Sequence, residues 1–258
     1  NPTVEQPVAV VEGSSGTATT NYDANDRVIK QTNPEGDFVE YTRDARGNVT
    51  QTRAVAKPGS GLADIMTSGG YDASCTNAVT CNQPNWTQDA LGNRTDYSYD
   101  ATHGQVTRVQ LPSPTADAAG TETGTRPEIN YGYTTLYAQQ KDASGNLVPV
   151  SIPQYKVTQI TSCATAATCP GSASETKVTI EYNSPNLLPT KVTTASGNGA
   201  ISASVSYAYD SRDNLVAIDG PLPGSDDTTT YIYDAQDRRR GTIGPDPDGA
   251  GARPRSAE

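Results

Sequence analysis

The stretch Tyr207-Ala208-Tyr209-Asp210-Ser211-Arg212-Asp213-Asn214-Leu215-Val216-Ala217-Ile218 decides the fold. Its two tyrosines are two residues apart, so both rings lie on one face of a strand, because side chains alternate with a period of two. Asp210 suits the first position of a type I turn, where its carboxylate accepts from a backbone N–H two residues on. Asp213 tolerates the left-handed conformation that returns the chain as a bulged hairpin. The β-branched residues that follow complete a strand, tight turn, strand unit.

The unit recurs along the chain as D-x-x-[GD]-[NR], and a repeat decides the architecture before any single element does. The first and fourth residues of its six copies are Asp23 and Asp26, Asp44 and Gly47, Asp89 and Gly92, Asp142 and Gly145, Asp210 and Asp213, and Asp234 and Asp237. The fourth residue of each copy is expected to have a positive φ, which Gly adopts freely and Asp tolerates. A looser turn is expected to follow each unit, as at 33–36 and 219–221.

Tyr-x-Tyr pairs accompany the turns and carry much of the apolar bulk. They are Tyr97 and Tyr99, Tyr131 and Tyr133, Tyr207 and Tyr209, and Tyr231 and Tyr233. Leu, Ile and Phe are scarce, and each aromatic ring can bury about 150–250 Å². We therefore expect at least one ring of each pair to be largely buried, against neighbouring strands or a partner copy, with its hydroxyl bonded or reaching water.

The composition opposes a compact enzyme core. Hydrophobic residues make up 34% of the 258 residues, with one Phe, one Trp and one Met. The net charge of −10 opposes binding to nucleic acid or to anionic membrane surfaces. Low hydrophobicity leaves disorder as an alternative, which the regular tyrosines disfavour. No helix, membrane span or signal peptide is predicted, and the start at Asn1-Pro2 without Met suggests a mature or excised piece.

These patterns predict an all-β fold: a repetitive antiparallel strand–turn–strand sheet, elongated or like a shell or solenoid, and possibly a fragment of a larger assembly. A single region over 1–258 is expected. Clear repeats span about 17–53, 86–111, 129–150 and 176–245. Loop insertions span about 54–82, 112–128 and 162–175, and residues 246–258 form a tail.

Four cysteines form two pairs with the same spacing, Cys75 with Cys81 and Cys163 with Cys169. Zinc sites need His or Cys ligands spaced two to four apart, and the chain has one His. Two local disulfides in an oxidising compartment are the favoured interpretation, and two free thiol pairs remain the alternative. A loop of this size contributes roughly 2 kcal/mol, so the bridges pin loops and do not hold the fold together.

The D-x-x-G-[NR] units with flanking Tyr-x-Tyr resemble the YD-repeat or Rhs-repeat family over roughly residues 17–245. That family includes bacterial Rhs proteins, the C-components of toxin-complex shells and the extracellular part of teneurins. The resemblance implies a β-sheet that spirals into a hollow shell, often around a toxic C-terminal cargo. It implies neighbouring repeats of a longer chain, other copies, or an enclosed toxin as partners. This chain is short for a full shell.

The expected function is therefore a non-catalytic structural segment of a secreted or surface bacterial protein, as shell wall or fibre, with no cofactor and no metal. A carbohydrate- or cell-surface-binding adhesin is the alternative. A third reading is self-cleavage near Asp246 and Asp248, whose loop loosely resembles a D-P-x-G signature of Rhs cores but lacks its continuation. The turn aspartates lack the oxygen ladder of a calcium loop. His103 has no Ser or Cys partner in any motif, which disfavours a triad.

Overall fold

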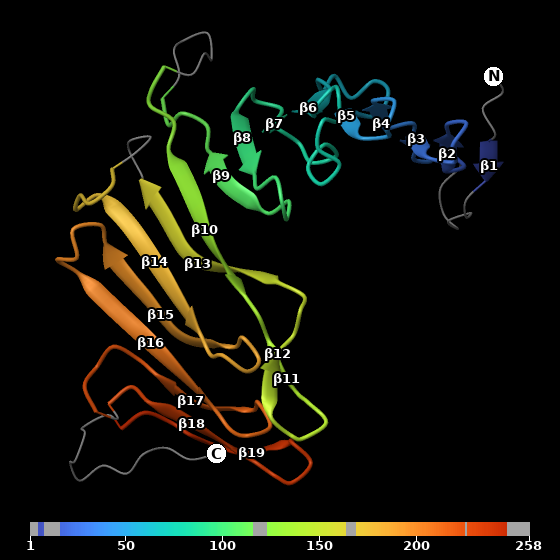
Figure 1. Cartoon of the computed structure of the whole chain (residues 1–258). Helices are drawn as coiled ribbons and strands as arrows, with labels where there is room; N and C mark the ends of the chain where they lie inside the picture. Colours follow the sequence, from blue (N-terminus) through green and yellow to red (C-terminus); the bar gives the residue numbers. More distant parts are fainter. Residues whose placement is uncertain (1–4, 8–15, 116–122, 164–168, 225, 247–258) are drawn as a thin grey trace. The chain divides into compact units, whose positions relative to one another are not determined.

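The computed structural model describes residues 5–7, 16–115, 123–163, 169–224 and 226–246. All regular elements in this described part are β-strands, and they pair antiparallel (Figure 1). The all-β antiparallel fold predicted from the repeats is thereby confirmed. The chain divides into two compact units, Asn1–Arg126 and Pro127–Glu258.

Unit 1 is an antiparallel meander in which each strand pairs with the next along the chain. Short connections between successive strands favour this arrangement. Its strands are β1 (Glu5–Pro7), β2 (Thr19–Tyr22), β3 (Val28–Thr32), β4 (Phe38–Arg43), β5 (Val49–Val55), β6 (Ile65–Gly70), β7 (Trp86–Gln88), β8 (Arg94–Tyr99) and β9 (Val106–Gln110).

Unit 2 is a second meander, interrupted once by a small separate hairpin of β11 (Gln139–Lys141) and β12 (Leu147–Pro149). Around that hairpin β10 pairs directly with β13, and the later strands pair in chain order. The strands of the meander are β10 (Glu128–Leu136), β13 (Gln154–Cys163), β14 (Glu175–Tyr182), β15 (Pro189–Ser196), β16 (Ser202–Tyr209), β17 (Leu215–Asp219), β18 (Thr229–Tyr233) and β19 (Arg239–Ile243).

Rows of cross-strand partners run across each meander. In unit 1 Lys30, Glu40 and Arg53 stand in register on three adjacent strands, and Arg53 also pairs with Asp64 at 2.5 Å. Arg53 Nη1 lies 2.8 Å from Glu40 Oε1. Phe38 and Val55 pair on this same face, where Lys30 Nζ lies 3.6 Å from the centroid of the Phe38 ring, whereas Val39 and Ala54 pair on the opposite face. In unit 2 the register row Tyr131, Ile160, Val178 and Thr194 forms an apolar face, since cross-strand partners share a face.

Neither face is fully covered within the described residues. Among their apolar side chains only Cys81, Cys163 and Leu187 are buried. The tyrosine-bearing strands are half-buried along most of their length. A sheet face of this kind keeps part of its apolar surface in water.

The expected insertions differ from the observed elements in one respect. The segment 54–82 was expected to be a loop, but its residues Ile65–Gly70 form β6, which pairs with both β5 and β7. Its Ser-Gly-Gly end looks like a linker in sequence, whereas pairing with a strand on each side keeps it extended. Residues 116–122, 164–168 and 247–258, in the other two insertions and the tail, lie outside the described residues.

Candidate functional site: turns, tyrosines and the disulfide loop

The repeat turns share one hydrogen-bond pattern. In the turn at Asp210 the amide of Asp213 donates to the carbonyl of Asp210 at 3.1 Å, and the amide of Asp210 donates to the carbonyl of Asn214 at 3.0 Å. The Asp210 carboxylate accepts from the amides of Arg212 and Asn214 at 2.8 and 3.0 Å. The same carboxylate bonds occur in the turns that start at Asp23, Asp44, Asp89, Asp142 and Asp234.

The fourth residue of every copy is left-handed, as the pattern predicts. The φ angles are 58° at Asp26, 67° at Asp213 and 61° at Asp237, and they lie between 83° and 98° at Gly47, Gly92 and Gly145. A strand-register shift stands directly before several turns, at Tyr22, Arg43, Tyr99, Tyr182, Tyr209 and Tyr233. The turn and the bulge together reverse the chain direction and match the right-handed twist of the two flanking strands.

Sequence analysis missed two turns of related geometry. Asp72 begins one of them: its carboxylate accepts from the amides of Ser74 and Thr76, both at 3.0 Å, and the fourth residue, Cys75, has φ 48°. The Tyr71-Asp72-Ala73 sequence was the available signal. The other begins at Asn183, where Leu187 has φ 58° and is buried. Asn replaces Asp and the turn is one residue longer, so the six-copy pattern does not match it.

The residue before a turn links its hairpin to the preceding strand. Tyr71, Tyr99, Tyr182 and Tyr209 donate their hydroxyls to the carbonyls of Val49, Pro84, Val157 and Pro189, at 3.2, 2.8, 2.8 and 2.9 Å. Arg43 stands where these tyrosines stand and donates to the Val28 carbonyl at 3.2 Å. We call these five bonds the back-ties. They explain the Tyr-Asp pair physically, because the Tyr joins neighbouring hairpins and the Asp shapes the turn.

The paired tyrosines all have a similar, intermediate burial. All eight rings of the Tyr-x-Tyr pairs are half-buried, and none is fully buried. Within each unit one sheet supplies neighbours to these rings on one side only, so the burial of one ring of each pair against a partner copy stays a prediction. Tyr97 and Tyr99 stack with ring centroids 6.4 Å apart. Burial raises the pKa of Tyr99, Tyr182 and Tyr209, three of the residues that form back-ties.

Adjacent turns also contact one another along one edge of each unit. In unit 2 Arg212 donates to the Ala235 carbonyl at 2.9 Å and pairs with Asp237 at 3.2 Å. Asn214 donates to Asp237 at 2.7 Å. Asn186 bonds Asp213. The third and fifth residues of a turn therefore bind the turn that follows.

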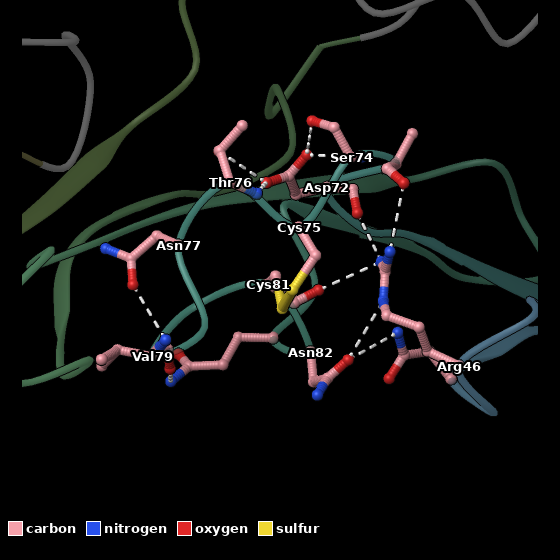
Figure 2. The surroundings of a disulfide bond; sticks show 12 residues. Arg46, Asp72, Ser74, Cys75, Thr76, Asn77, Val79, Cys81 and Asn82 are labelled. Carbon is pink, nitrogen blue, oxygen red and sulfur yellow. Dashed lines mark hydrogen bonds between the residues drawn. A yellow bond between two sulfur atoms is a disulfide. The ribbon is translucent and has the colours of Figure 1, made fainter.

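In unit 1 the loop closed by the Cys75–Cys81 disulfide contacts the turn that precedes it, as the turns of unit 2 contact one another (Figure 2). The Cys75–Cys81 and Cys163–Cys169 disulfides are both formed in the structure. Figure 2 shows the Arg46 side chain directed at the first loop, where it donates to Ala73 O at 3.1 Å, Cys81 O at 3.3 Å, Asn82 Oδ1 at 3.2 Å and Asp72 O. Arg46 occupies the same turn position as Arg212.

The other end of this loop contacts the next turn. Asn77 Nδ2 donates to the Ala101 carbonyl at 2.8 Å, and Gln83 Nε2 donates to the Gly104 carbonyl at 2.8 Å. A Cβ on Gly104 would lie 2.9 Å from Val79 Cγ1, and Gly104 also has φ 73°, so only Gly fits there. The loop is thus held between the turns at 44–48 and 100–105.

Electrostatics of the turns is dominated by hydrogen bonds to carboxylates. The pKa of Asp72 is lowered to about 2, first by the Ser74 hydroxyl and then by the amides of Thr76 and Ser74. The side-chain amides of Asn93 and Asn214 are the largest causes of the lowered pKa of Asp89 and Asp210. Hydrogen bonds within their own turns stabilise the ionised form of these carboxylates. They are therefore poorly suited to act as general acids.

No group of three or more His, Cys, Asp or Glu side chains in the described part of the chain could hold a metal ion. His103 is largely buried and its Nε2 lies 3.5 Å from Asp100 Oδ1, within its own turn. Asp246 is the last described residue and Asp248 lies outside the described residues. No helix found among the described residues is long and apolar enough to cross a membrane.

A comparison with family models identifies the repeat of one segment. The family model described as RHS Repeat matches residues 22–57, which confirms the resemblance for that segment. No curated protein matches the chain.

Solved structures that match the chain include "Crystal Structure of TcdB2-TccC3-Cdc42" and "Crystal Structure of TcdB2-TccC3". Their sequence identity to this chain is 14% in both cases, and their TM-scores are 0.36 and 0.35. The match covers 90% of this chain but 14% of theirs, so the chain spans a small part of their length. A porin-like protein from Bacteroides uniformis matches at 11% identity with a TM-score of 0.37, over 96% of this chain and 91% of its own.

Proposed function

We propose that this chain, which carries an RHS Repeat at residues 22–57, is a non-catalytic structural segment of a secreted or surface protein. In this role the sheet acts as wall or fibre. The observation that carries the proposal is the use of the repeat side chains. Tyrosines, turn aspartates and turn arginines all hold one hairpin at a fixed place beside the next. Backbone ladders then supply stiffness across the sheet.

The half-exposed apolar faces support a role within a larger assembly. Ile160 and Val178 pair on adjacent strands of unit 2 and are half-buried, beside the equally half-buried Tyr131. Such a face gains stability when further apolar surface covers it, at roughly 25 cal/mol per Å². The proposed cover is neighbouring repeats of a longer chain or other copies of this one, and an enclosed toxin is a further proposed partner. Two disulfides support placement in an oxidising compartment.

Sugar binding is a second candidate with one specific observation behind it. A hollow of about 340 Å³ lies over Gly69, lined by Tyr71 and the side chains of Thr52, Thr67 and Thr87. Two hydrogen bonds oppose this candidate, because they occupy groups that would bind a sugar. The Tyr71 hydroxyl donates to the Val49 carbonyl, and the Thr87 hydroxyl is hydrogen-bonded to the Tyr97 hydroxyl. The eight tyrosines of the Tyr-x-Tyr pairs are half-buried, and two of them, Tyr99 and Tyr209, form back-ties. Self-cleavage near Asp246 ranks third.

Self-association of the purified chain tests the structural proposal. Sedimentation velocity over a range of concentrations should show oligomers that form through the apolar face. Val178→Lys should abolish them, because a charge on that face opposes burial. Thr179→Lys is the matched control on the opposite face, and association should persist in it. A chain that stays monomeric at every concentration, and that binds sugars on a glycan array in a manner lost in Tyr71→Ala, would instead support the adhesin.

A further inference from the structure

Cys75 occupies a turn position that the other repeats give to Gly or Asp. It is the fourth residue of the turn that begins at Asp72, and its φ of 48° lies in the left-handed region. A Cys has no side-chain group that favours this conformation, and a strained residue persists only when its surroundings fix it. Its disulfide to Cys81 is the covalent restraint at that point.

The same disulfide lies next to the backbone carbonyls that accept hydrogen bonds from Arg46. Cys81 is 2% exposed, and its carbonyl accepts from Arg46 at 3.3 Å. The Ala73 carbonyl, two residues before Cys75, accepts from the same guanidinium at 3.1 Å. The bridge therefore brings the two ends of the loop to one side chain of the preceding turn, as Figure 2 shows.

We propose that the Cys75–Cys81 disulfide is a redox-sensitive lock on the turn edge of unit 1. The turn edge comprises the turn at 44–48, the loop at 72–83 and the turn at 100–105. In the oxidised state the lock replaces Gly as the device that keeps a repeat turn left-handed. In the reduced state Cys75 relaxes, the loop carbonyls leave Arg46, and the three segments of the edge separate while the strands stay paired.

A dithiol reductant such as dithiothreitol supplies the electrons. Its thiolate attacks Sγ of Cys75, which is half-exposed, and the electron pair of the broken S–S bond leaves on Sγ of Cys81, which takes up a proton. The second thiolate of the reagent then attacks the mixed disulfide and releases Cys75 as a thiol. The reagent departs as a cyclic disulfide, so two electrons and two protons pass to the protein.

Amide hydrogen exchange of the full chain, read by mass spectrometry, measures the effect. The Cys163→Ser/Cys169→Ser variant should be used, so that one bridge responds. On adding dithiothreitol, peptides that cover 72–83 and the turns at 44–48 and 100–105 should exchange about tenfold faster. Peptides from β4 and β5, and from the turn at 210–214 of unit 2, should be unchanged. Equal exchange at 44–48 in both states, or loss of protection throughout β4 and β5, would overturn the proposal.

A matched pair of variants isolates the conformational part of the lock. Both remove the bridge, one as Cys75→Gly/Cys81→Ser and the other as Cys75→Ser/Cys81→Ser. Gly takes the left-handed conformation freely and Ser does not. The Gly variant should therefore retain more protection at 44–48 than the Ser variant. Arg46→Met should raise exchange at 72–83 even in the oxidised protein. Identical exchange in the Gly and Ser variants would contradict the assigned role of Cys75.

Discussion

The hydroxyl of Tyr209, on β16, donates to the backbone carbonyl of Pro189, which begins β15, at 2.9 Å. The bond lies beside the turn at Asp210 and joins two adjacent strands beyond their ladder register. Its loss should leave a half-buried carbonyl without its partner. Tyr209→Phe is therefore expected to lower the free energy of unfolding by about 1 kcal/mol. Chemical denaturation of both proteins measures the difference.

Two further substitutions bracket that value. Tyr209→Ala also removes a half-buried ring and should cost about 2 kcal/mol, less than truncation of a fully buried aromatic. Tyr137→Phe is the control, since Tyr137 is 47% exposed, and it should leave stability unchanged. A Tyr209→Phe protein as stable as wild type would show that the back-tie does not contribute to the free energy of unfolding.

The left-handed turn residues give a second prediction. Asp26→Gly should raise the free energy of unfolding by up to about 1 kcal/mol, because Gly takes the φ of 58° without a steric penalty. Asp213→Gly and Asp237→Gly should gain less, since those carboxylates bond Asn186 and Asn214. Gly92→Ala should lower the free energy of unfolding by about 1 kcal/mol, because its Cβ would make only an ordinary contact with Gln88 Nε2 at 3.8 Å but the Ala would have a strained φ of 89°. Thermal unfolding that ranks the four variants otherwise would contradict the turn assignment.

Acid should weaken the turn at Asp72. The pKa of Asp72 is lowered from 3.8 to about 2 in the folded chain, so the unfolded chain binds this proton more readily than the folded one. The stabilisation is therefore present above pH 3.8 and is lost as the pH falls through about 2. Melting temperatures from pH 6 to pH 2 should fall less in Asp72→Asn than in wild type. NMR titration of the Asp72 carboxylate checks the pKa itself.

Alkali should act on the back-ties with the opposite sign. Burial raises the pKa of Tyr99, Tyr182 and Tyr209 above the ordinary value of 10.0, so folding favours their protonated form. Their contribution is complete below pH 10 and is lost as the pH rises through the raised values. Ultraviolet titration should show late-ionising tyrosines. The triple Phe variant should lack that late fraction, and an unchanged titration curve would refute the assignment.

The disulfides predict the behaviour of the thiols. Iodoacetamide without reductant should label no cysteine in the purified chain, because all four are paired. Peptide mapping should recover Cys75 with Cys81 and Cys163 with Cys169, and no crossed pairs. Four reactive thiols before reduction would contradict both the bridges and the proposed oxidising compartment.

Turn geometry could be predicted from sequence because it depends on backbone sterics within five residues. Gly47, Gly92 and the three turn aspartates needed no knowledge of the sheet. The contacts of Arg46 could not be predicted, because they depend on a register that brings residues 26 to 36 positions away beside it. Cys75 was not predicted to be a left-handed turn residue, because among L-residues only Asn and Asp are expected to adopt a positive φ at that position. The half-burial of the tyrosines depends on how many layers pack together, which no local pattern reports.

Each back-tie points toward the N-terminus. The donors at 43, 71, 99, 182 and 209 all bond carbonyls 15 to 25 residues earlier in the chain. A polypeptide that emerges N-terminus first, from a ribosome or a secretion channel, can therefore complete every tie as soon as its donor appears. Each tie thus needs no later residue, and a contact so close in sequence has a small loop-closure cost. As far as the back-ties are concerned, the hairpins can therefore dock in chain order, each one on the hairpin before it.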